Sequence, residues 1–272
     1  MNRTARRSAP HATPRRTPLA AVAAALAGAL LLAGCGGGSD GAGSDAGGET
    51  VTLRVLAAAS LTETFTALGE RFEAAHPGTR VELSFGPSSG LAEQIGSGAP
   101  ADVFAAASPS TMQTVVDSGD AQEPQDFATN RAEIAVPAAN PGDVDALADL
   151  ADPAVKVAVC DPEVPCGALA ADVLASAGLD VTPVTEEEDV KAVLTKVTLG
   201  EVDAGLVYVT DVQAAGDEVR GVEVPEADAA STTYPIAALA GSEHAEQARA
   251  FVDLVLSEEG RTALEDAGFG LP

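Results

Sequence analysis

The sequence predicts an α/β protein of two lobes, in which each lobe is a mainly parallel sheet flanked by helices. Three observations predict this fold class. Strand-like runs alternate with amphipathic, helix-like runs from residue 51 onward, a rhythm typical of parallel sheets. The stretch after residue 49 is about 220 residues long, which exceeds one typical domain and suits two separate cores. That stretch also lacks any segment with the length and apolar character of a membrane span.

The first lobe begins with a strand followed by a helix. Residues 51–56 have the pattern of a strand, and an apolar stripe at helical spacing follows over residues 61–72. Ser60 precedes this stripe and Glu63 stands three residues later, which is the spacing of a capping box. The expected elements are strand 51–56, helix 61–75, strand 80–84, helix 89–97, strand 102–106 and a helix over 109–118 that begins at Ser108-Pro109.

A second set of elements with the same rhythm predicts the second lobe. Gly178 and Gly200 follow two of its helical patterns and mark where those helices end. The expected elements are strand 132–136, a helix near 143–150, strand 155–160, helix 167–177, helix 189–199 and strand 204–209. The chain then ends with strand 232–239 and helices 243–256 and 258–267.

The first 34 residues predict an export signal. Five arginines precede an apolar run over residues 19–33, which is too short and too rich in Ala for a membrane span. The tetrapeptide ending at Cys35 resembles the lipobox of bacterial lipoproteins, whose cysteine carries the lipid. An ordinary cleaved signal with an incidental cysteine is the alternative, and the Sec and twin-arginine routes both stay open. Residues 35–48 are almost all Gly, Ser, Ala and Asp, which predicts a flexible tether.

The charge of the chain excludes one class of partner and constrains another. The sequence has 41 acidic and 15 basic residues, and five of the basic ones lie in the leader. So acidic a protein does not bind nucleic acid through a basic surface. Its overall field also repels anions, so that an anion would have to be captured by local dipoles in a closed pocket.

Two junctions between a strand and a helix carry small hydroxyl residues. Ser60 stands at the first junction, and Ser88 and Ser89 stand at the second. The first N–H groups of a helix lack partners within the helix and lie at the positive end of its dipole, so they can hold an anion without a basic side chain. Capping alone would explain one such serine. Two similar junctions about thirty residues apart favour an anion site.

The cysteines beyond the leader form an even pair. Cys160 and Cys166 would lie in an exported, oxidising setting, where a disulfide can form. Such a bond would close a short loop and stabilise the fold by about 2 kcal/mol, mainly by stiffening that loop. Zinc would need further ligands, and only His76 and His244 remain outside the leader. We therefore expect no directly bound metal cation.

Several separated segments together resemble the molybdate-binding (ModA-type) branch of the periplasmic binding proteins of ABC importers. The resemblance runs from about residue 51 to 270 and rests on the order and spacing of its segments. These segments are Ala57-Ala58-Ala59-Ser60-Leu61-Thr62, Ser84-Phe85, Ser89-Gly90-Leu91-Ala92, Gly98 to Phe104, Asp161 to Gly167, Glu188-Asp189-Val190, Gly205-Leu206-Val207-Tyr208 and Tyr234-Pro235-Ile236.

The resemblance implies a two-lobed periplasmic-binding-protein fold (type II) with a ligand cleft between the lobes. Residues 49–130 and 230–272 would form lobe 1, and residues 131–229 would form lobe 2. In that family, serine and tyrosine hydroxyls and backbone N–H groups hold one oxyanion. Carried over by position, the oxyanion-binding residues are Ser60, Ser89, Cys166, Val190 and Tyr208, with Ser88 as the near alternative to Ser89. Cys166 departs from the alanine usual in its turn, which puts the orientation of that loop in doubt.

The function that the resemblance implies is capture of molybdate or tungstate and delivery to an ABC permease. We expect no enzymatic activity and no cofactor, a monomer, and contact with the membrane through a lipid on Cys35 alone. The protein would be exported and held at the outer face of the cytoplasmic membrane. An array of neutral donors would favour a fully deprotonated dianion, because a protonated phosphate would turn its own donor toward another donor.

Three alternatives stay open at this point. A sulfate or thiosulfate receptor is less favoured, because the matched segments are those of the molybdate branch. An exported hydrolase with Ser60 or Ser89 as nucleophile would need a general base, and the sequence has no Gly-x-Ser-x-Gly motif. A redox protein using Cys160 and Cys166 is disfavoured because five residues separate the two cysteines, unlike Cys-x-x-Cys.

Overall fold

The computed structural model describes residues 50–225 and 231–272. The export signal, the lipidation residue Cys35 and most of the expected tether lie outside the described residues. Residues Gly47–Pro272 form one compact unit. Of the helices described, none combines the length and the apolar character needed to cross a membrane.

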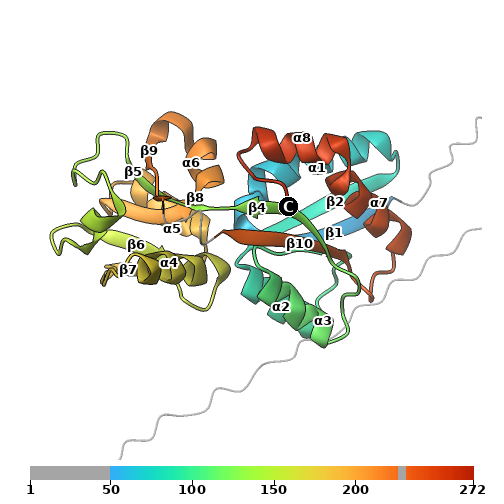
Figure 1. The fold of residues 1–272 in the computed structure, drawn as a ribbon. Helices are drawn as coiled ribbons and strands as arrows, with labels where there is room; N and C mark the ends of the chain where they lie inside the picture. The colour runs from blue at the N-terminus through green and yellow to red at the C-terminus, as the bar shows by residue number, and fades with distance from the viewer. Residues whose placement is uncertain (1–49, 226–230) are drawn as a thin grey trace, which may run out of the picture. The chain divides into compact units, whose positions relative to one another are not determined.

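Lobe 1 is built on a five-stranded sheet of order β2-β1-β3-β10-β4 (Figure 1). Here β1 pairs in parallel with β2 and β3, whereas β10 runs antiparallel to β3 and β4. Its elements are β1 (Val51–Ala58), η1 (Ala59–Leu61), α1 (Thr62–Ala75), β2 (Thr79–Gly86), α2 (Ser88–Gly96), β3 (Val103–Ala105), α3 (Pro109–Asp117), β4 (Gln125–Asn130), β10 (Thr232–Ala238), α7 (Ala245–Leu256) and α8 (Glu258–Asp266).

Helices cover both faces of the lobe 1 sheet. Helices α1, α7 and α8 lie on one face, and α2 and α3 lie on the other (Figure 1). The alternation along β1 explains this arrangement, because Leu53 and Val55 face the first helix layer while Leu56 faces the second. The apolar stripe of α1 is buried as its spacing predicts, and Phe65 and Phe72 have no exposed surface.

Lobe 2 is built on a second five-stranded sheet of order β7-β6-β8-β5-β9. Its buried residues form one apolar cluster that is rich in Val and Ala. Its elements are β5 (Ala132–Pro137), η2 (Leu147–Ala151), β6 (Val157–Cys160), α4 (Pro165–Ser176), β7 (Thr185–Glu187), α5 (Val190–Thr198), β8 (Ala204–Tyr208), α6 (Val209–Ala215), η3 (Gly216–Glu218) and β9 (Val219–Val222).

The α/β class and the two-lobed fold are as the sequence predicts, and each sheet is mixed because one strand runs antiparallel to the other four. In lobe 2, β6 is parallel to β7 and β8, while β5 is antiparallel to β8 and β9. The antiparallel strands in both sheets are those next to the passages between the lobes. Strand β5 enters lobe 2 directly after β4 leaves lobe 1, and β10 is the first strand after the return. A strand that arrives from the other lobe is not tied to the direction that a βαβ crossover imposes.

The helix expected near residues 143–150 is wrong. This segment begins with a turn in which Asn140 and Asp143 have positive φ angles, and only the short 3₁₀ turn η2 follows. The Asp149 carboxylate accepts hydrogen bonds from the backbone N–H groups of Asp145 and Ala146, both at 2.9 Å. These bonds hold the chain extended up to Ala146, so helical geometry begins at Leu147.

Candidate functional site

The starts of five helical segments converge on one small cavity that both lobes line. The cavity has a volume of about 20 Å³. One water needs about 10–15 Å³ on this measure, so the cavity suits a small ion rather than a sugar or a peptide. This cavity, termed the donor cavity, is lined by Ala58, Ala59, Ser60, Gly86, Pro87, Ser88 and Ala107 of lobe 1 and by Val164, Pro165, Cys166, Asp189, Val190 and Tyr208 of lobe 2.

Residues in the first turns of three helices contribute to the lining. Ser88 opens α2, Cys166 is the second residue of α4, and Val190 opens α5. N–H groups at these positions have no carbonyl one turn earlier to accept them, and they lie at the positive end of the helix dipole. The Asp189 carboxylate caps α5 by accepting from the N–H of Ala192 at 2.9 Å, as the sequence predicts. This bond occupies one oxygen of the only acidic side chain among the lining residues that the structure describes.

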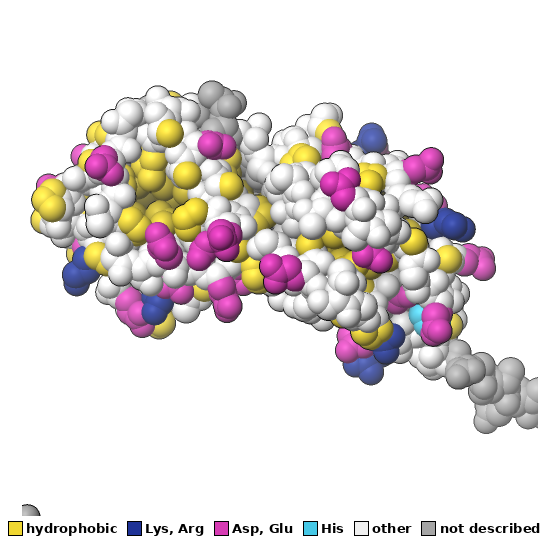
Figure 2. Space-filling model, turned by 90° about the horizontal axis from the view of Figure 1, so that it is seen from below, with side chains coloured by type: hydrophobic (Ala, Val, Ile, Leu, Met, Phe, Trp, Pro, Cys, Tyr) yellow, Lys and Arg dark blue, Asp and Glu magenta, His cyan; other side chains and the backbone are white. Residues whose placement is uncertain are grey.

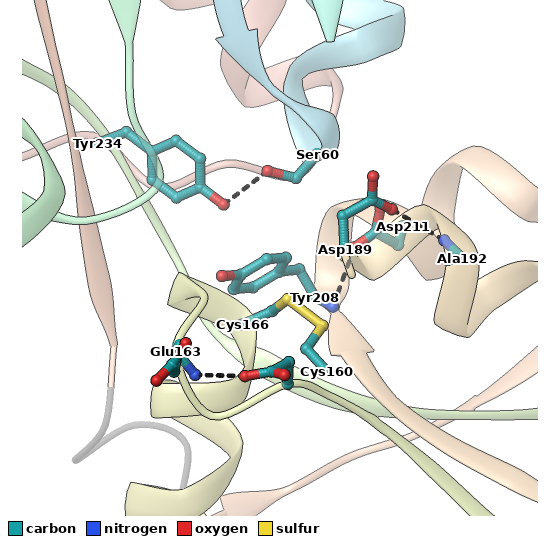
Figure 3. Close-up of a disulfide and its surroundings, with 10 residues drawn as sticks. Ser60, Cys160, Glu163, Cys166, Asp189, Ala192, Tyr208, Asp211 and Tyr234 are labelled. Carbon is teal, nitrogen blue, oxygen red and sulfur yellow. Dashed lines mark hydrogen bonds between the residues drawn. A yellow bond between two sulfur atoms is a disulfide. The ribbon is translucent and has the colours of Figure 1, made fainter. Parts of the chain in front are cut away.

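Ser60 lies at the donor cavity but does not cap α1. It is the middle residue of the 3₁₀ turn η1, and α1 begins at Thr62 without a side-chain cap. The Ser60 Oγ atom lies 2.9 Å from the Oη atom of Tyr234 in β10 (Figure 3). Its side chain therefore reaches into the sheet instead of back along its own helix, and the expected capping box with Glu63 is wrong.

The second junction places Ser88 at the cavity and Ser89 elsewhere. Ser88 is 1% exposed, and its Oγ atom accepts a hydrogen bond from the N–H of Ala107 at 3.0 Å. Ser89 instead lines a different hollow together with Glu163. Adjacent residues at the start of a helix point about 100° apart, so only one of the two serines can face the cavity. The sequence favoured Ser89, but the structure places Ser88 at the cavity, because spacing along the chain does not fix the direction of each side chain.

Tyr208 ends β8 and presents a buried hydroxyl at the cavity. The side chain is 2% exposed, and its Oη atom has no hydrogen-bond partner within the part of the chain that the structure describes. Burial raises the pKa of the Tyr208 hydroxyl well above its usual value of 10.0. The group therefore stays protonated and keeps a proton available to donate. Figure 3 shows its ring between the Ser60–Tyr234 pair and the nearby disulfide.

Cys160 and Cys166 form a disulfide that joins the end of β6 to the first turn of α4. The S–S distance is 2.04 Å and the two Cα atoms are 5.7 Å apart. Gly167 follows in the same turn, where a Cβ atom would collide with the carbonyl oxygen of Asp161. The turn that carries the Cys166 N–H is therefore fixed by a covalent bond and by a close backbone approach.

The charged side chains of Lys191, Asp211 and Glu63 form ion pairs beside the donor cavity and are not among its lining residues. None of the lining residues that the structure describes is Lys or Arg, and Lys191 follows Val190 of the lining directly along the chain. Lys191 Nζ lies 3.1 Å from Oδ1 of the buried Asp211 and 2.9 Å from Glu63 of lobe 1. Burial lowers the pKa of Lys191, but Asp211 and Glu63 outweigh it and the pKa lies above 10.5. Figure 2 shows acidic side chains scattered over one face of the molecule rather than gathered in a patch.

The two histidines of the described chain lie away from the donor serines. His76 ends α1, where its ring stacks on Phe72 and its Nδ1 atom lies 3.0 Å from the Phe72 carbonyl oxygen. His244 precedes α7. Neither is among the residues that line the cavity. The general base that a serine hydrolase would need is therefore not provided by a histidine of residues 50–225 or 231–272.

Residues 53–270 match the family model for the bacterial extracellular solute-binding protein. The chain belongs to that family. Members of the solute-binding family are transport receptors, and the two lobes with a cavity between them have the architecture that such a receptor needs.

Individual relatives and solved structures show which members of the solute-binding family this chain is similar to. The chain is 42% identical over 219 residues to the molybdate-binding protein ModA of Mycobacterium tuberculosis, covering 80% of this chain and 84% of the relative. It is 31% identical to a putative ABC transporter substrate-binding lipoprotein of Bacillus subtilis, covering 80% and 86%. The periplasmic molybdate-binding protein of Azotobacter vinelandii has the same fold, with a TM-score of 0.72, 22% identity and coverage of 81% and 99%.

Proposed function

We propose that this protein captures molybdate or tungstate in the donor cavity and delivers it to the membrane permease of an ABC importer. The observation that carries the proposal is the Tyr208 hydroxyl, which is buried and protonated and has no partner within the described chain. Leaving such a group unpaired costs about 1–3 kcal/mol, and a bound acceptor would remove that cost. Ser60, Ser88, Cys166 and Val190 line the same cavity, and their hydroxyls or backbone N–H groups are the further donors that we propose for the ligand.

The chemistry of these groups favours a fully deprotonated tetrahedral dianion. Hydroxyls and backbone N–H groups can all donate, and each oxygen of such a dianion can accept. A protonated phosphate would point its own hydroxyl at a donor, at a cost of about 1–3 kcal/mol. Both lobes line the cavity, so binding would favour the arrangement in which donors of lobe 1 and lobe 2 meet.

The names of the relatives support the choice of ligand and carrier. The mycobacterial relative, at 42% identity, is named for molybdate binding. Molybdate and tungstate are tetrahedral dianions of almost the same size, so both belong to the proposal. The ligand is cargo and undergoes no reaction, and we propose that the protein acts as a monomer without a cofactor.

We further propose that the protein is anchored by lipid on Cys35 at the outer face of the cytoplasmic membrane. The sequence around Cys35 resembles a lipobox, and the Bacillus relative is named as a lipoprotein. Labelling cells with a radioactive or clickable fatty acid tests the anchor. We expect label on the wild-type protein and none on Cys35→Ser, and an unlabelled wild-type protein would refute the anchor.

Calorimetric titration of the compact unit Gly47–Pro272 with molybdate, tungstate, sulfate and phosphate tests the proposed ligand. We expect one-to-one binding of molybdate and tungstate, with sulfate and phosphate much weaker. Tight sulfate binding with weak molybdate binding would instead establish a sulfate receptor. Folded protein that binds none of the four anions would refute the proposed function.

A further inference from the structure

The side-chain amide of Asn130 has a fixed orientation. Its Oδ1 atom lies 3.0 Å from the backbone N–H of Arg131, which can only donate a hydrogen bond. Oδ1 must therefore be the acceptor, and the Nδ2 donor points the other way. Nδ2 lies 2.9 Å from Oγ1 of Thr210 and 3.4 Å from Oη of Tyr234. Asn130 is 3% exposed and stands where the chain leaves lobe 1, so these protein partners, rather than water, set its orientation.

This orientation decides what the Tyr234 hydroxyl does. Tyr234 has no exposed surface, and its Oη atom accepts a hydrogen bond from Asn130 Nδ2 at 3.4 Å. Its own single proton can then be donated to Ser60 Oγ, which lies 2.9 Å away. Burial also raises the pKa of Tyr234 above its usual value, so that the hydroxyl keeps this proton.

The Ser60 hydroxyl then has one free direction for its proton. Its oxygen accepts from Tyr234, and Ser60 itself is 4% exposed and lines the donor cavity. We propose that Asn130 and Tyr234 are positioning residues that fix the Ser60 hydroxyl as a donor toward the cavity and so favour oxyanions without a proton. This inference deepens the proposed function and rests on it. The amide of Asn130, whose orientation is fixed, thus sets the direction of the series of hydrogen bonds that runs from Asn130 through Tyr234 to Ser60.

The series also joins the two lobes. Asn130 divides its two amide protons between Thr210 in α6 of lobe 2 and Tyr234 in β10 of lobe 1. The orientation of Ser60 therefore depends on a residue at the passage between the lobes, which a hinge motion would move. Sequence motifs around Ser60 do not reveal this dependence, because Asn130 and Tyr234 stand 70 and 174 positions away along the chain.

A double-mutant cycle tests the proposal. Tyr234→Phe keeps the ring and its edge contacts with Phe127 and Phe269 but removes the hydroxyl. We expect its affinity for molybdate to fall roughly tenfold, and its preference for molybdate over phosphate to narrow, because a freely turning Ser60 hydroxyl can accept from phosphate. In a Ser60→Ala background, the same change should alter molybdate affinity less than about twofold.

Each outcome of the cycle has one meaning. If wild-type protein binds none of the anions, the proposed function fails; if it binds molybdate and Tyr234→Phe matches it, the positioning role alone fails. If Tyr234→Phe lowered molybdate affinity equally in the wild-type and Ser60→Ala backgrounds, the positioning role would also be overturned, because the Tyr234 hydroxyl would then not act through Ser60. Thr233→Val on the same strand is the control and should leave affinity and preference unchanged.

A second variant covers the case in which Tyr234→Phe does not fold. Asn130→Asp keeps the size of the side chain but replaces the Nδ2 donor with an acceptor, so Tyr234 would donate to it and Ser60 would donate to Tyr234. We expect weaker molybdate binding and a narrowed preference over phosphate. In the Ser60→Ala background, Asn130→Asp should not narrow the preference for molybdate over phosphate any further. If Asn130→Asp narrowed this preference equally with and without the Ser60 hydroxyl, the proposal would be overturned.

Discussion

The ammonium of Lys191 in lobe 2 lies 2.9 Å from both carboxylate oxygens of Glu63 in lobe 1. Lys191 follows Val190, which lines the donor cavity, so the ion pair ties the start of α5 to α1 beside that cavity. The pair forms only when the lobes are this close. It therefore adds to the closed arrangement without touching the anion itself.

Glu63→Gln should weaken molybdate binding about twofold to fivefold, because an exposed ion pair contributes about 0.2–1 kcal/mol. The Glu63 side chain is 55% exposed and that of Lys191 is 24% exposed, so salt screens the pair and the effect should shrink at high ionic strength. Titration at low and high salt measures this, with Glu70→Gln on the exposed face of α1 as the control. Equal affinities of the two variants at low salt would refute the role of the pair.

Asp211 should make the stability of the protein depend on pH. Burial raises the pKa of this carboxyl from 3.8 to about 6, against the opposing effect of Lys191. The folded protein therefore holds the proton more tightly than the unfolded chain does. The contribution of the protonated Asp211 carboxyl to folding stability is therefore fully present below about pH 4 and is lost as the pH rises to about 6.

Urea unfolding of wild type and Asp211→Asn across this range measures the effect. We expect the free energy of unfolding of the wild type, relative to the variant, to fall between about pH 4 and about pH 6 and then to level off. Asp217→Asn, at an exposed position of η3, is the control, and its free energy of unfolding should change with pH as that of wild type does. A constant difference between wild type and Asp211→Asn would contradict the raised pKa.

Elements with clear periodicity could be predicted from the sequence, and those without it could not. Helix α1 follows its apolar stripe, and α3 begins at Ser108-Pro109, where the serine Oγ accepts from the N–H of Thr111. Strand β4 was not predicted, because its alternation is masked by polar residues at both ends. Strand β7 has only three residues, all polar, so its pairing with β6 is a tertiary effect.

Some residues of the candidate site could likewise be predicted from the sequence, and others could not. The family resemblance pointed to Ser60, Cys166, Val190 and Tyr208, and all four line one cavity, where each stands at the end of a strand or the start of a helix. It favoured Ser89 over Ser88, whereas the structure places Ser88 at the cavity, because the two serines differ in direction rather than in position along the chain. Nor did it reveal Asn130 and Tyr234, because hydrogen bonds between residues distant in the chain leave no local pattern.

Ser88→Ala should weaken molybdate binding roughly tenfold or more, whereas Ser89→Ala should leave it unchanged. Ser88 lines the donor cavity and Ser89 lines a separate hollow with Glu163. The adjacent position is a matched control, since both variants remove one hydroxyl from the first turn of α2. Thermal unfolding should accompany the titration, because Ser88 Oγ also accepts from the N–H of Ala107. The reverse ranking would assign the ligand to Ser89.

Replacing both cysteines should affect stability and binding together. The Cys160–Cys166 bond closes a loop of six residues in sequence separation, for which loop entropy gives about 2 kcal/mol. In a protein of this size that corresponds to a fall in Tm of roughly 4–8 °C. The bond also holds the first turn of α4, where Cys166 lines the cavity, so molybdate binding should weaken as that turn loosens.

Thermal unfolding and titration of the Cys160→Ser/Cys166→Ser variant, with and without reductant, separate these effects. Wild type treated with reductant should approach the variant in Tm and in affinity, and the variant itself should not respond to reductant. Because the two serines are near in size to the cysteines, packing around the loop should change little. If the variant lost stability but bound molybdate as wild type does, the disulfide would support the fold of lobe 2 without positioning the Cys166 N–H.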